Sequence, residues 1–351
     1  MLHRLRLCDF RLFADLDLRP DPSVTFIVGG NAQGKTSILE AVCVLLRLQS
    51  PRTASPAECT RFGCEAFSVD GQINDNHLQV KFHGRLKHFF INGKPPQSVG
   101  EYLGFGKVAW ISNADRELIS GSASARRKFL DFLGVQSLPG YLGNLRTYER
   151  ALRSRNALLR DGRPRSEISA FDGPLCAAGD FLLQARRDLV AVLSPLASAA
   201  YQGISGGEGL VRLAYQPGVA GRMQQALAAG RAAEERLRST QTGPHRDELS
   251  IDLDSRPSAA FCSEGQQRSL ALALKLAQAR ALESATGHPP VYLIDDVFGE
   301  LDPARRNNLL TELPTSAQKL ITTTSLEWWV QRGIGGRVFE VAGGKAGAVG
   351  L

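Results

Sequence analysis

The chain has 351 residues, 43% of them hydrophobic, and its 42 Lys and Arg residues exceed its 35 Asp and Glu residues by seven. This length exceeds the usual size of one domain, so we expect two lobes with ample core. The positive charge suits a polyanionic partner without identifying one. No apolar run approaches membrane length, and the alternating start MLHRLRLCDF differs from a signal peptide. We therefore expect a cytoplasmic protein with no membrane partner.

The six cysteines are spread along the chain, at Cys8, Cys43, Cys59, Cys64, Cys176 and Cys262. They form no Cys-x-x-Cys pair, and Cys59 and Cys64 have no matching Cys or His pair nearby. This spacing argues against a zinc site. Free thiols in a reducing cytosol are the favoured interpretation.

Residues 1–110 are predicted to form short strands around one helix. Leu5 to Leu18 keep a two-residue apolar period around a turn, and Val24 to Val28 form a continuous buried strand. Further strands are expected at 66–73, 78–82, 89–91 and 107–111. These pieces suit a mixed sheet in a nucleotide-binding lobe.

The helix of this region follows a glycine-bounded loop. Gly29, Gly34, Lys35 and Thr36 occupy every required position of G-x-x-x-x-G-K-[ST], between a strand and a helix. Such a loop surrounds a polyphosphate with backbone N–H groups at a helix N-terminus. Lys35 is expected to reach the β- and γ-phosphates, and the Thr36 hydroxyl to bind Mg²⁺. The predicted nucleotide contacts are Gly29, Gly30, Asn31, Ala32, Gln33, Gly34, Lys35 and Thr36.

Residues 115–240 change to helical spacing. In the segment 141–160 one stripe is apolar, formed by Tyr141, Leu145, Tyr148, Leu152 and Leu159. A second stripe, offset by about 100° of rotation, is cationic. It consists of Arg146, Arg150, Arg153 and Arg160. This stripe is either a solvated helix face or a DNA-contacting surface, and both interpretations stay open.

The rest of this helical segment supplies fewer signals. A second helix is predicted over 182–193, with Pro195 as its stop or kink, and the Gly-rich residues 201–209 are predicted to be a loop. Further basic residues at 126–128, 163 and 165 make this the densest basic region of the chain. No heptad pattern continues for many turns, so a long coiled coil is not expected.

Strands and helices alternate again after Gly243-Pro244. Strands are predicted over 249–253, 291–294, 319–323 and 338–341, and an Ala/Leu-rich buried helix over 266–284. The first and last segments would then build one lobe. We expect a discontinuous ATPase lobe of residues 1–114 and 241–351, with a mainly helical lobe of residues 115–240 inserted.

The strand Val291-Tyr-Leu-Ile-Asp-Asp296 ends in two carboxylates, the form of a Walker B element. Two buried acids at a strand end are costly without a cation. We therefore predict that Asp295 binds Mg²⁺, directly or through water, and that Asp296, near the attacking water, is the candidate general base. Asp296 and Lys35 are the predicted catalytic residues.

Ser263 precedes the Ala/Leu-rich helix and is a candidate N-cap, and Gly265 and Gln266 follow within its first turn. Ser263 lies 28 residues before Val291. This order of loop, helix and Walker B strand, followed by Glu300-Leu301-Asp302, resembles ABC-type ATPase heads. In such heads the signature loop of one subunit covers the γ-phosphate held by the other. The resemblance implies a head-to-tail homodimer closing around two ATP molecules, with Ser263, Gly265 and Gln266 as nucleotide contacts.

Several blocks together resemble the RecF family of bacterial recombination mediators over nearly the whole chain. They are Gly29 to Thr36, Leu39-Glu40-Ala41, Ser50-Pro51-Arg52-Thr53, Arg126-Arg127-Lys128-Phe129-Leu130-Asp131, Arg155-Asn156-Ala157-Leu158-Leu159, Gly243-Pro244-His245-Arg246-Asp247, Ser263 to Gln267 and Leu293 to Asp302. The resemblance implies a slow, DNA-stimulated ATPase that binds gapped, junction or single-stranded DNA in an ATP-dependent way. It also implies work with RecR and RecO to load RecA, in the SOS response and in replication restart.

The chain departs from the family pattern at two places. Gly30 stands where the family often has a polar residue, and Ser112-Asn113-Ala114-Asp115 replaces a Ser-Pro-Glu-Asp run. These departures leave the geometry of the loop and the nucleotide contacts of the second segment open. A separate contrast is with transporter ATPases, which place a switch histidine where this chain has Thr322, Thr323 and Thr324.

Two other functions fit the nucleotide motifs alone. A transporter ATP-binding subunit is disfavoured because 227 residues, including the arginine stripe, separate Thr36 from Ser263. A small-molecule kinase would need neither the Ser263 segment nor DNA. One scaffold hosts many functions, so the fold alone does not choose among them.

Overall fold

The computed structural model describes residues 1–350 and divides into two compact units, each described here by itself. Unit 1 comprises Met1–Asp115, Gly203–Gly206 and Gln278–Leu351, and unit 2 comprises Arg116–Gln202 and Gly207–Ala277. The first division lies one residue from the expected boundary at 114. Residues 241–277, which we expected in the ATPase lobe, belong to unit 2 instead. The reason is strand pairing, because β9 (Glu248–Leu253) pairs antiparallel with β8 (Val211–Gln216) of the same unit.

A six-stranded mixed sheet carries the core of unit 1. Its strand order is β14-β13-β3-β12-β11-β7, and all neighbouring pairs are parallel except β13 with β14. The bounds are β3 (Val24–Val28), β7 (Val108–Ser112), β11 (Val291–Asp295), β12 (Lys319–Thr323), β13 (Arg337–Ala342) and β14 (Lys345–Val349). The apolar runs of β3, β11 and β12 are buried, as their composition predicts.

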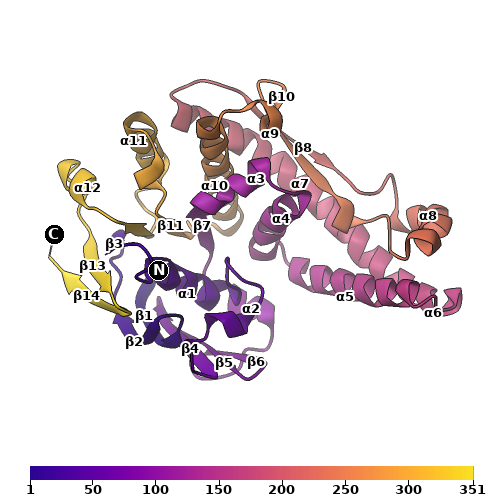
Figure 1. The fold of residues 1–351 in the computed structure, drawn as a ribbon, viewed down its shortest axis with the longest axis horizontal. Helices are drawn as coiled ribbons and strands as arrows, with labels where there is room; N and C mark the ends of the chain where they lie inside the picture. The colour runs from indigo at the N-terminus through magenta and orange to yellow at the C-terminus, as the bar shows by residue number, and fades with distance from the viewer. Residues whose placement is uncertain (351) are drawn as a thin grey trace. The chain divides into compact units, whose positions relative to one another are not determined.

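The second sheet of unit 1 is antiparallel, with strand order β2-β1-β4-β5-β6. Its strands are β1 (Leu2–Phe10), β2 (Phe13–Leu18), β4 (Ala66–Ile73), β5 (Asn76–His83) and β6 (Leu86–Ile91). Burial alternates along β4 and β5, so one face is packed and the other is open. Helix α1 (Lys35–Arg47) lies between the two sheets and is buried along nearly its whole length (Figure 1).

Short elements complete unit 1. They are η1 (Pro56–Cys59), α2 (Val99–Leu103), η2 (Asn113–Arg116, whose last residue falls in unit 2), η4 (Phe298–Glu300), α11 (Pro303–Glu312) and α12 (Glu327–Gln331). Among residues 1–350, no helix combines the length and the apolar character that crossing a membrane requires.

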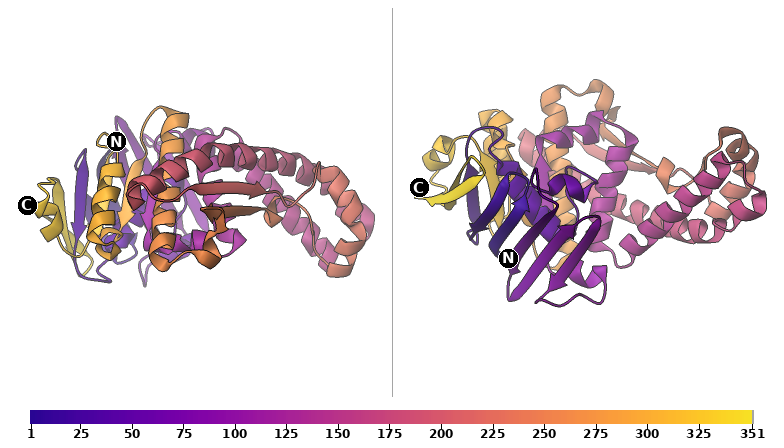
Figure 2. Two further views of the ribbon diagram at one scale, coloured as in Figure 1. Left: turned by 90° about the horizontal axis from the view of Figure 1, so that it is seen from above. Right: turned by 60° about the horizontal axis from the view of Figure 1, so that its bottom comes forward.

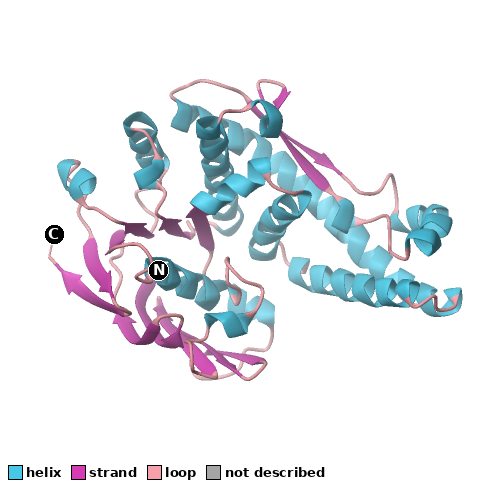
Figure 3. Cartoon of the chain, in the orientation of Figure 1, coloured by secondary structure: helices cyan, strands magenta, loops and turns pink. Residues whose placement is uncertain are grey.

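Unit 2 is mainly helical, with one three-stranded sheet of order β10-β9-β8 (Figure 3). Its elements are α3 (Glu117–Ser120), α4 (Ala123–Ser137), α5 (Tyr141–Arg160), α6 (Arg165–Ser169), α7 (Asp172–Ser205), α8 (Met223–Leu237), η3 (Pro244–Arg246), β10 (Arg256–Pro257), α9 (Ser258–Phe261) and α10 (Glu264–Thr286). Helices α7 and α10 continue into unit 1 at their C-terminal ends. The inserted segment therefore contains a strand, β8, that the helical pattern hid.

The helix around Pro195 is longer than predicted. Helix α7 spans 34 residues and continues through Pro195, so this proline does not stop it, and residues 201–205, predicted as part of a loop, are its last turn. Leu193, Ala197, Tyr201 and Ile204 are buried on both sides of the proline. We infer that this packing offsets the backbone hydrogen bond that proline removes. The expected absence of a long coiled coil holds for residues 1–350.

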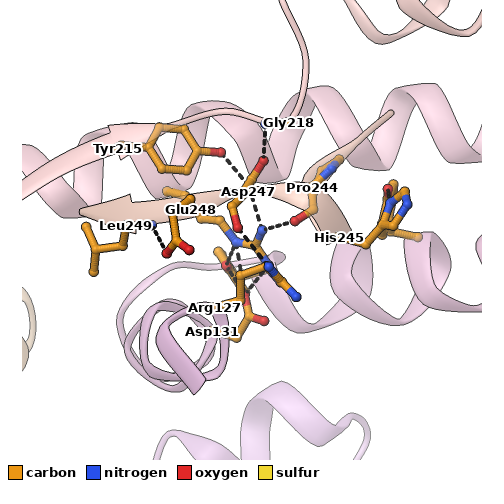
Figure 4. A network of polar contacts seen from close by, with 12 residues as sticks. Arg127, Asp131, Tyr215, Gly218, Pro244, His245, Asp247, Glu248 and Leu249 are labelled. Carbon is orange, nitrogen blue, oxygen red and sulfur yellow. Dashed lines mark hydrogen bonds and ion pairs between the residues drawn. The ribbon is translucent and has the colours of Figure 1, made fainter. Parts of the chain in front are cut away.

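A buried ion-pair network holds the segment 243–247 in unit 2 (Figure 4). Asp247 is 1% exposed and accepts hydrogen bonds from Arg186 (2.7 Å), the Tyr215 hydroxyl (2.5 Å) and the Gly218 N–H (2.8 Å). Arg186 also donates to Asp131 (2.8 Å) and to the Pro244 carbonyl (2.7 Å). Burial opposes the charge on Arg186, but the carboxylates outweigh it and raise its pKa.

A second buried network fixes the residues just before this segment. Arg155 is fully buried and donates to Asp172 (2.8 Å), Glu234 (2.7 Å) and Thr240 (2.9 Å). His245 contacts the Tyr148 hydroxyl (2.6 Å), and burial lowers its pKa. Sequence reasoning left His245, Arg246 and Asp247 without a role. The structure assigns His245 and Asp247 to the framework of unit 2, whereas Arg246 stays exposed.

We expect Asp247→Ala to lower the free energy of unfolding by about 3–5 kcal/mol, because Arg186 loses its buried carboxylate partner and keeps only the half-buried Asp131. The measurement is urea denaturation followed by circular dichroism. Asp252→Ala is the matched control, since Asp252 lies on β9, the strand that directly follows Asp247, and is only half-buried. Equal losses in the two variants would contradict the role given to Asp247.

Candidate nucleotide site

The glycine-bounded loop joins β3 to α1. At Gly34 φ is +106°, a conformation that other residues rarely adopt, and a Cβ at Gly29 would collide with the Val341 carbonyl of β13. Lys35 folds back over the loop, and its Nζ donates to the carbonyl oxygens of Gly29 (2.6 Å) and Gly30 (2.9 Å). The two glycines are thus required by the fold of the loop itself, in addition to any approach of a phosphate.

The two acidic residues lie at the carboxyl end of β11, between β7 and β12. The Thr36 hydroxyl donates to Asp295 Oδ1 (2.9 Å), and the Thr322 hydroxyl donates to the same oxygen (2.8 Å). Thr322 Oγ1 also accepts a hydrogen bond from the Asp296 N–H (2.8 Å). One hydroxyl therefore orients both acidic positions. The structure brings Lys35, Thr36, Asp295 and Asp296 together at this sheet edge.

Of the two acids, Asp296 has the unusual backbone conformation and the raised pKa. Its backbone has φ of +53°, which is uncommon for a residue other than glycine, although Asp and Asn tolerate it best. Burial raises the pKa of its carboxyl, Lys35 opposes this effect, and the charges of Asp295 and Glu300 add to it. A raised pKa favours a group that accepts protons, the property of a general base.

Asn113 comes from the segment whose family pattern was altered. Its amide nitrogen donates to the Asp296 carbonyl (3.1 Å) and to Glu300 Oε1 (2.7 Å). Its Oδ1 is buried and has no hydrogen-bond partner in the described chain. An unpaired buried oxygen is costly, and here it lies one residue from the carboxyl end of β7. Asn113 thus joins the acidic site by a route that the sequence did not show.

A cavity of about 450 Å³ opens over the loop. Besides residues 30–37 and the two acids, it is lined by Arg11, Leu12, Arg52, Glu58, Thr60 and Phe62. Phe62 is fully exposed and Leu12 is 54% exposed, so two apolar side chains line the cavity beside its polar loop and acids. Such a combination suits a nucleotide, whose base is flat and apolar on its faces.

Glu40 positions two arginines that line the cavity. Its side chain is fully buried and accepts hydrogen bonds from Arg11 (2.6 and 2.9 Å), Arg52 (3.2 Å) and Ser50 (2.5 Å). Arg11 and Arg52 both line the cavity. The Leu39-Glu40-Ala41 and Ser50 to Thr53 blocks carried this signal in the sequence, but nothing there pointed to Phe62.

The donors present fit Mg²⁺. A hydroxyl from Thr36 and a carboxylate from Asp295 are hard oxygen ligands, and Mg²⁺ takes one or two such groups together with waters and substrate phosphates. No cluster of three or more His, Cys, Asp or Glu residues able to hold a metal occurs among residues 1–350. Such a cluster is not needed when the nucleotide supplies further oxygens.

The second predicted nucleotide segment belongs to unit 2. Ser263 Oγ accepts a hydrogen bond from the Gln266 N–H (3.3 Å), while Gln266 Oε1 accepts one from the Ser263 N–H (2.9 Å). This reciprocal pair is a capping box at the N-terminus of α10. Ser263 therefore caps this helix, as its position predicts, and Gly265 lies in the same first turn.

The arginines of the inserted segment separate into two sets. Arg126, Arg127, Arg163 and Arg165 are engaged within unit 2, with Glu248, the Asp247 carbonyl, Glu167 and Asp172 respectively. The stripe of Arg146, Arg150, Arg153 and Arg160 is exposed on α5, and within it only Arg153 has a carboxylate partner among residues 1–350, Glu149 at 3.9 Å. The stripe is thus available to a partner.

A P-loop between a buried parallel strand and a helix, facing a neighbouring strand that ends in two carboxylates, defines a P-loop ATPase head of the ABC type. The AAA domain family matches residues 4–128. The chain is 39% identical over 339 residues to the DNA replication and repair protein RecF of Anaeromyxobacter sp., covering 91% of each chain, and 36% identical to that of Acidothermus cellulolyticus, covering 93% of this chain and 94% of the relative. The chain belongs to the RecF family.

Solved structures agree with this assignment. A structure titled recombination mediator protein RecF-ATP in RecFOR pathway superposes with a TM-score of 0.90 at 28% identity, covering 99% of this chain and 97% of the other. A structure of an Smc head bound to a ScpA domain superposes with a TM-score of 0.56 at 15% identity, covering 100% of this chain and 97% of the other. The second likeness shows the fold alone, and it agrees with the expected α/β head fold.

We expect Asp296→Asn to raise the free energy of unfolding at pH 7.5, measured by chemical denaturation, by at most about 1 kcal/mol because the carboxyl is partly exposed. The sign follows from the raised pKa: the folded state disfavours the ionised carboxylate, so its cost is present above the folded pKa and disappears below the unfolded pKa. The gain should therefore shrink as the pH falls toward 4.

Asp295→Asn is the control for this measurement. Asp295 accepts two hydroxyl hydrogen bonds at 2.9 and 2.8 Å, so the amide should bring no such gain. A gain for Asp296→Asn that is the same at pH 7.5 and pH 4 would assign the effect to the backbone conformation alone.

Proposed function

We propose that this chain is an ATP-dependent DNA-binding protein of recombinational repair that binds ATP and Mg²⁺ in the cavity above the P-loop. The observation that supports it most is the meeting of Lys35, Thr36, Asp295 and Asp296 at one sheet edge beneath a cavity of about 450 Å³. The relatives named RecF and the solved structure titled RecF-ATP add to this support.

The roles proposed for the residues follow from their chemistry. Lys35 exchanges its two carbonyl contacts for the β- and γ-phosphates, and the loop N–H groups of residues 29–34 surround them. Thr36 and Asp295 hold Mg²⁺, which neutralises phosphate charge. Asp296, with its raised pKa, accepts a proton from the attacking water. We expect slow, DNA-stimulated hydrolysis, with binding as the primary role.

The nucleotide also closes a homodimer in this proposal. Ser263, Gly265 and Gln266 of one copy would meet the γ-phosphate held by Lys35 of the other copy. The capping box fixes Ser263 at a helix N-terminus, where backbone N–H groups and the helix dipole favour an anion. Closure around two ATP molecules then links nucleotide binding to assembly.

DNA is the proposed partner of the closed dimer, through the arginine stripe of α5. By likeness to relatives in the RecFOR pathway, the protein would act in the cytoplasm on gapped, junction or single-stranded DNA. It would assist RecO and RecR in loading RecA, in the SOS response and in replication restart. The direct experiment is equilibrium binding to gapped, duplex and single-stranded DNA, each with ADP or ATP at fixed salt. Affinity that is the same for all nucleotides and all DNA forms would contradict this function.

We expect Lys35→Ala to weaken ATP binding about 10- to 150-fold, the loss of about 1.5–3 kcal/mol from charged hydrogen bonds. Lys345→Ala, which removes an exposed lysine of β14, is the control and should bind ATP normally.

Ser263→Arg should keep ATP binding but abolish ATP-driven dimerisation in sedimentation, whereas Ser255→Arg in the exposed β9–β10 turn should leave dimerisation unchanged. Normal dimerisation of both Lys35→Ala and Ser263→Arg would contradict the sandwich.

Replacing Arg146, Arg150 and Arg153 by Glu should weaken DNA binding and reduce its salt dependence, by about 0.9 in the logarithmic slope for each duplex phosphate that the variant no longer neutralises. The measurement is fluorescence anisotropy with a labelled duplex between 50 and 200 mM salt, concentrations at which such slopes are resolved. The control replaces Arg222, Arg231 and Arg236, which are exposed around α8, by Glu. An unchanged slope in the first variant would make the stripe a solvated helix face.

A further inference from the structure

The open face of the antiparallel sheet in unit 1 has an uneven charge distribution. The right-hand view of Figure 2 turns this face toward the viewer. Over β1 and β2 each arginine has a carboxylate partner on the neighbouring strand, Arg4 with Asp17 (2.8 Å) and Arg6 with Asp15 (3.3 Å). This half of the face is therefore electrically balanced.

The other half, over β5 and β6, is cationic. Between Asn76 and Lys94 the chain has four Lys or Arg residues, three of its six His residues and no Asp or Glu. The strand register places His83 opposite Leu86 and Lys81 opposite His88, and these side chains are exposed or half-buried. We call the outward side chains of residues 77, 79, 81, 83, 86, 88 and 90, with Arg85 at the turn, the β5–β6 face.

The lysine and arginine of the β5–β6 face lack carboxylate partners. Lys81 and Arg85 form no ion pair within residues 1–350. Asp70 of β4 faces His77 (3.6 Å) and accepts from Gln79, and Glu65, just before β4, lines a pocket with His83 and Gly84. Paired arginines on one half of a sheet and unpaired cations on the other half indicate that the second half meets an anion from outside the chain.

Apolar groups lie among these cations. The Lys81 ammonium stands 5.7 Å from the centre of the Phe90 ring, and Leu86 is 65% exposed. Cations interleaved with an aromatic ring and an aliphatic side chain on an open sheet face suit a nucleic acid, because its phosphates pair with cations and its sugars and bases pack against carbon.

We propose that the β5–β6 face is a second DNA-contacting surface, located on the ATPase unit and separate from the arginine stripe of α5. Lys81 and Arg85 contact backbone phosphates, and Phe90 and Leu86 contact the sugar or base. Charged residues on an edge strand also prevent sheets of different molecules from pairing. Lys81, however, lies on β5, one strand in from the edge, where it does not guard the unpaired backbone of β6. The inference rests on the proposed DNA-binding function.

The test compares two variants of the full chain that change the charge equally on the same face. Lys81→Gln/Arg85→Gln removes two unpaired cations, and Arg4→Gln/Arg6→Gln removes two cations that already have partners. Binding to a labelled duplex with ATP is followed by anisotropy against salt concentration. We expect the logarithmic salt slope of the first variant to fall by about 1.8, two phosphates at about 0.9 each, and that of the second to stay unchanged.

Three results would overturn the inference. An equal loss of salt slope in both variants would indicate that only the net charge of the protein matters, and not contacts made by Lys81 and Arg85. An unchanged slope in Lys81→Gln/Arg85→Gln, while the α5 variant loses slope, would restrict DNA to α5 and leave the proposed function intact. An unchanged slope together with self-association in sedimentation would assign the cations to protection of the sheet edge. Absence of DNA binding in the unaltered protein would contradict the proposed function itself.

Discussion

The nucleotide site depends on one small hydrogen-bonded cluster, in which Asp295 accepts from the hydroxyls of Thr36 and Thr322. These three residues come from the start of α1 and the ends of two parallel strands, so the cluster joins segments from opposite ends of the chain. Parallel pairing of β11 with β12 and of β12 with β3 sets their separation. A shift of one residue in either register would turn the side chains to the other face and dissolve the site. The stability of the mixed sheet is therefore a condition of the chemistry.

The polar networks of unit 2 likewise fix the arrangement of elements that are distant in the chain. Arg155 and Asp247 are buried charges whose partners come from several helices and from the segment 240–247. Buried ion pairs are poor sources of net stability, but removing one partner is costly, so they tie the surrounding elements to one arrangement. Helix α7, which contains Pro195, and the surface helix α5 with its arginine stripe are thus held in a defined geometry.

Within unit 1 the two sheets have different surroundings. The parallel strands are buried by helices on their faces, which explains their continuous apolar runs, whereas the antiparallel sheet packs one face on α1 and leaves the other open. An open face can carry charged side chains, and cations there that have no ion-pair partner within the chain indicate a surface for an external anion.

The amino-acid sequence by itself determined the features that depend on local spacing. The P-loop, the strand ending in Asp295 and Asp296, the Ser263 cap and the buried strands over 24–28 and 319–323 all follow from neighbours within a few residues, where periodicity and turn chemistry act. The RecF family and the ATPase-head class were also predicted, and both are confirmed.

Tertiary structure decided the rest. Thr322 and Asn113 join the site because strand order places the ends of β12 and β7 beside the end of β11, and no local pattern encodes strand order. Phe62 joins it from the loop before β4, which no local pattern pointed to. Residues 241–277 belong to unit 2 because β9 finds its partner in β8, and α7 continues past Pro195 because packing outweighs the lost hydrogen bond. A charged residue such as Arg155 is expected at the surface when only the sequence is known. It is buried because its partners, which are distant in the chain, compensate its charge.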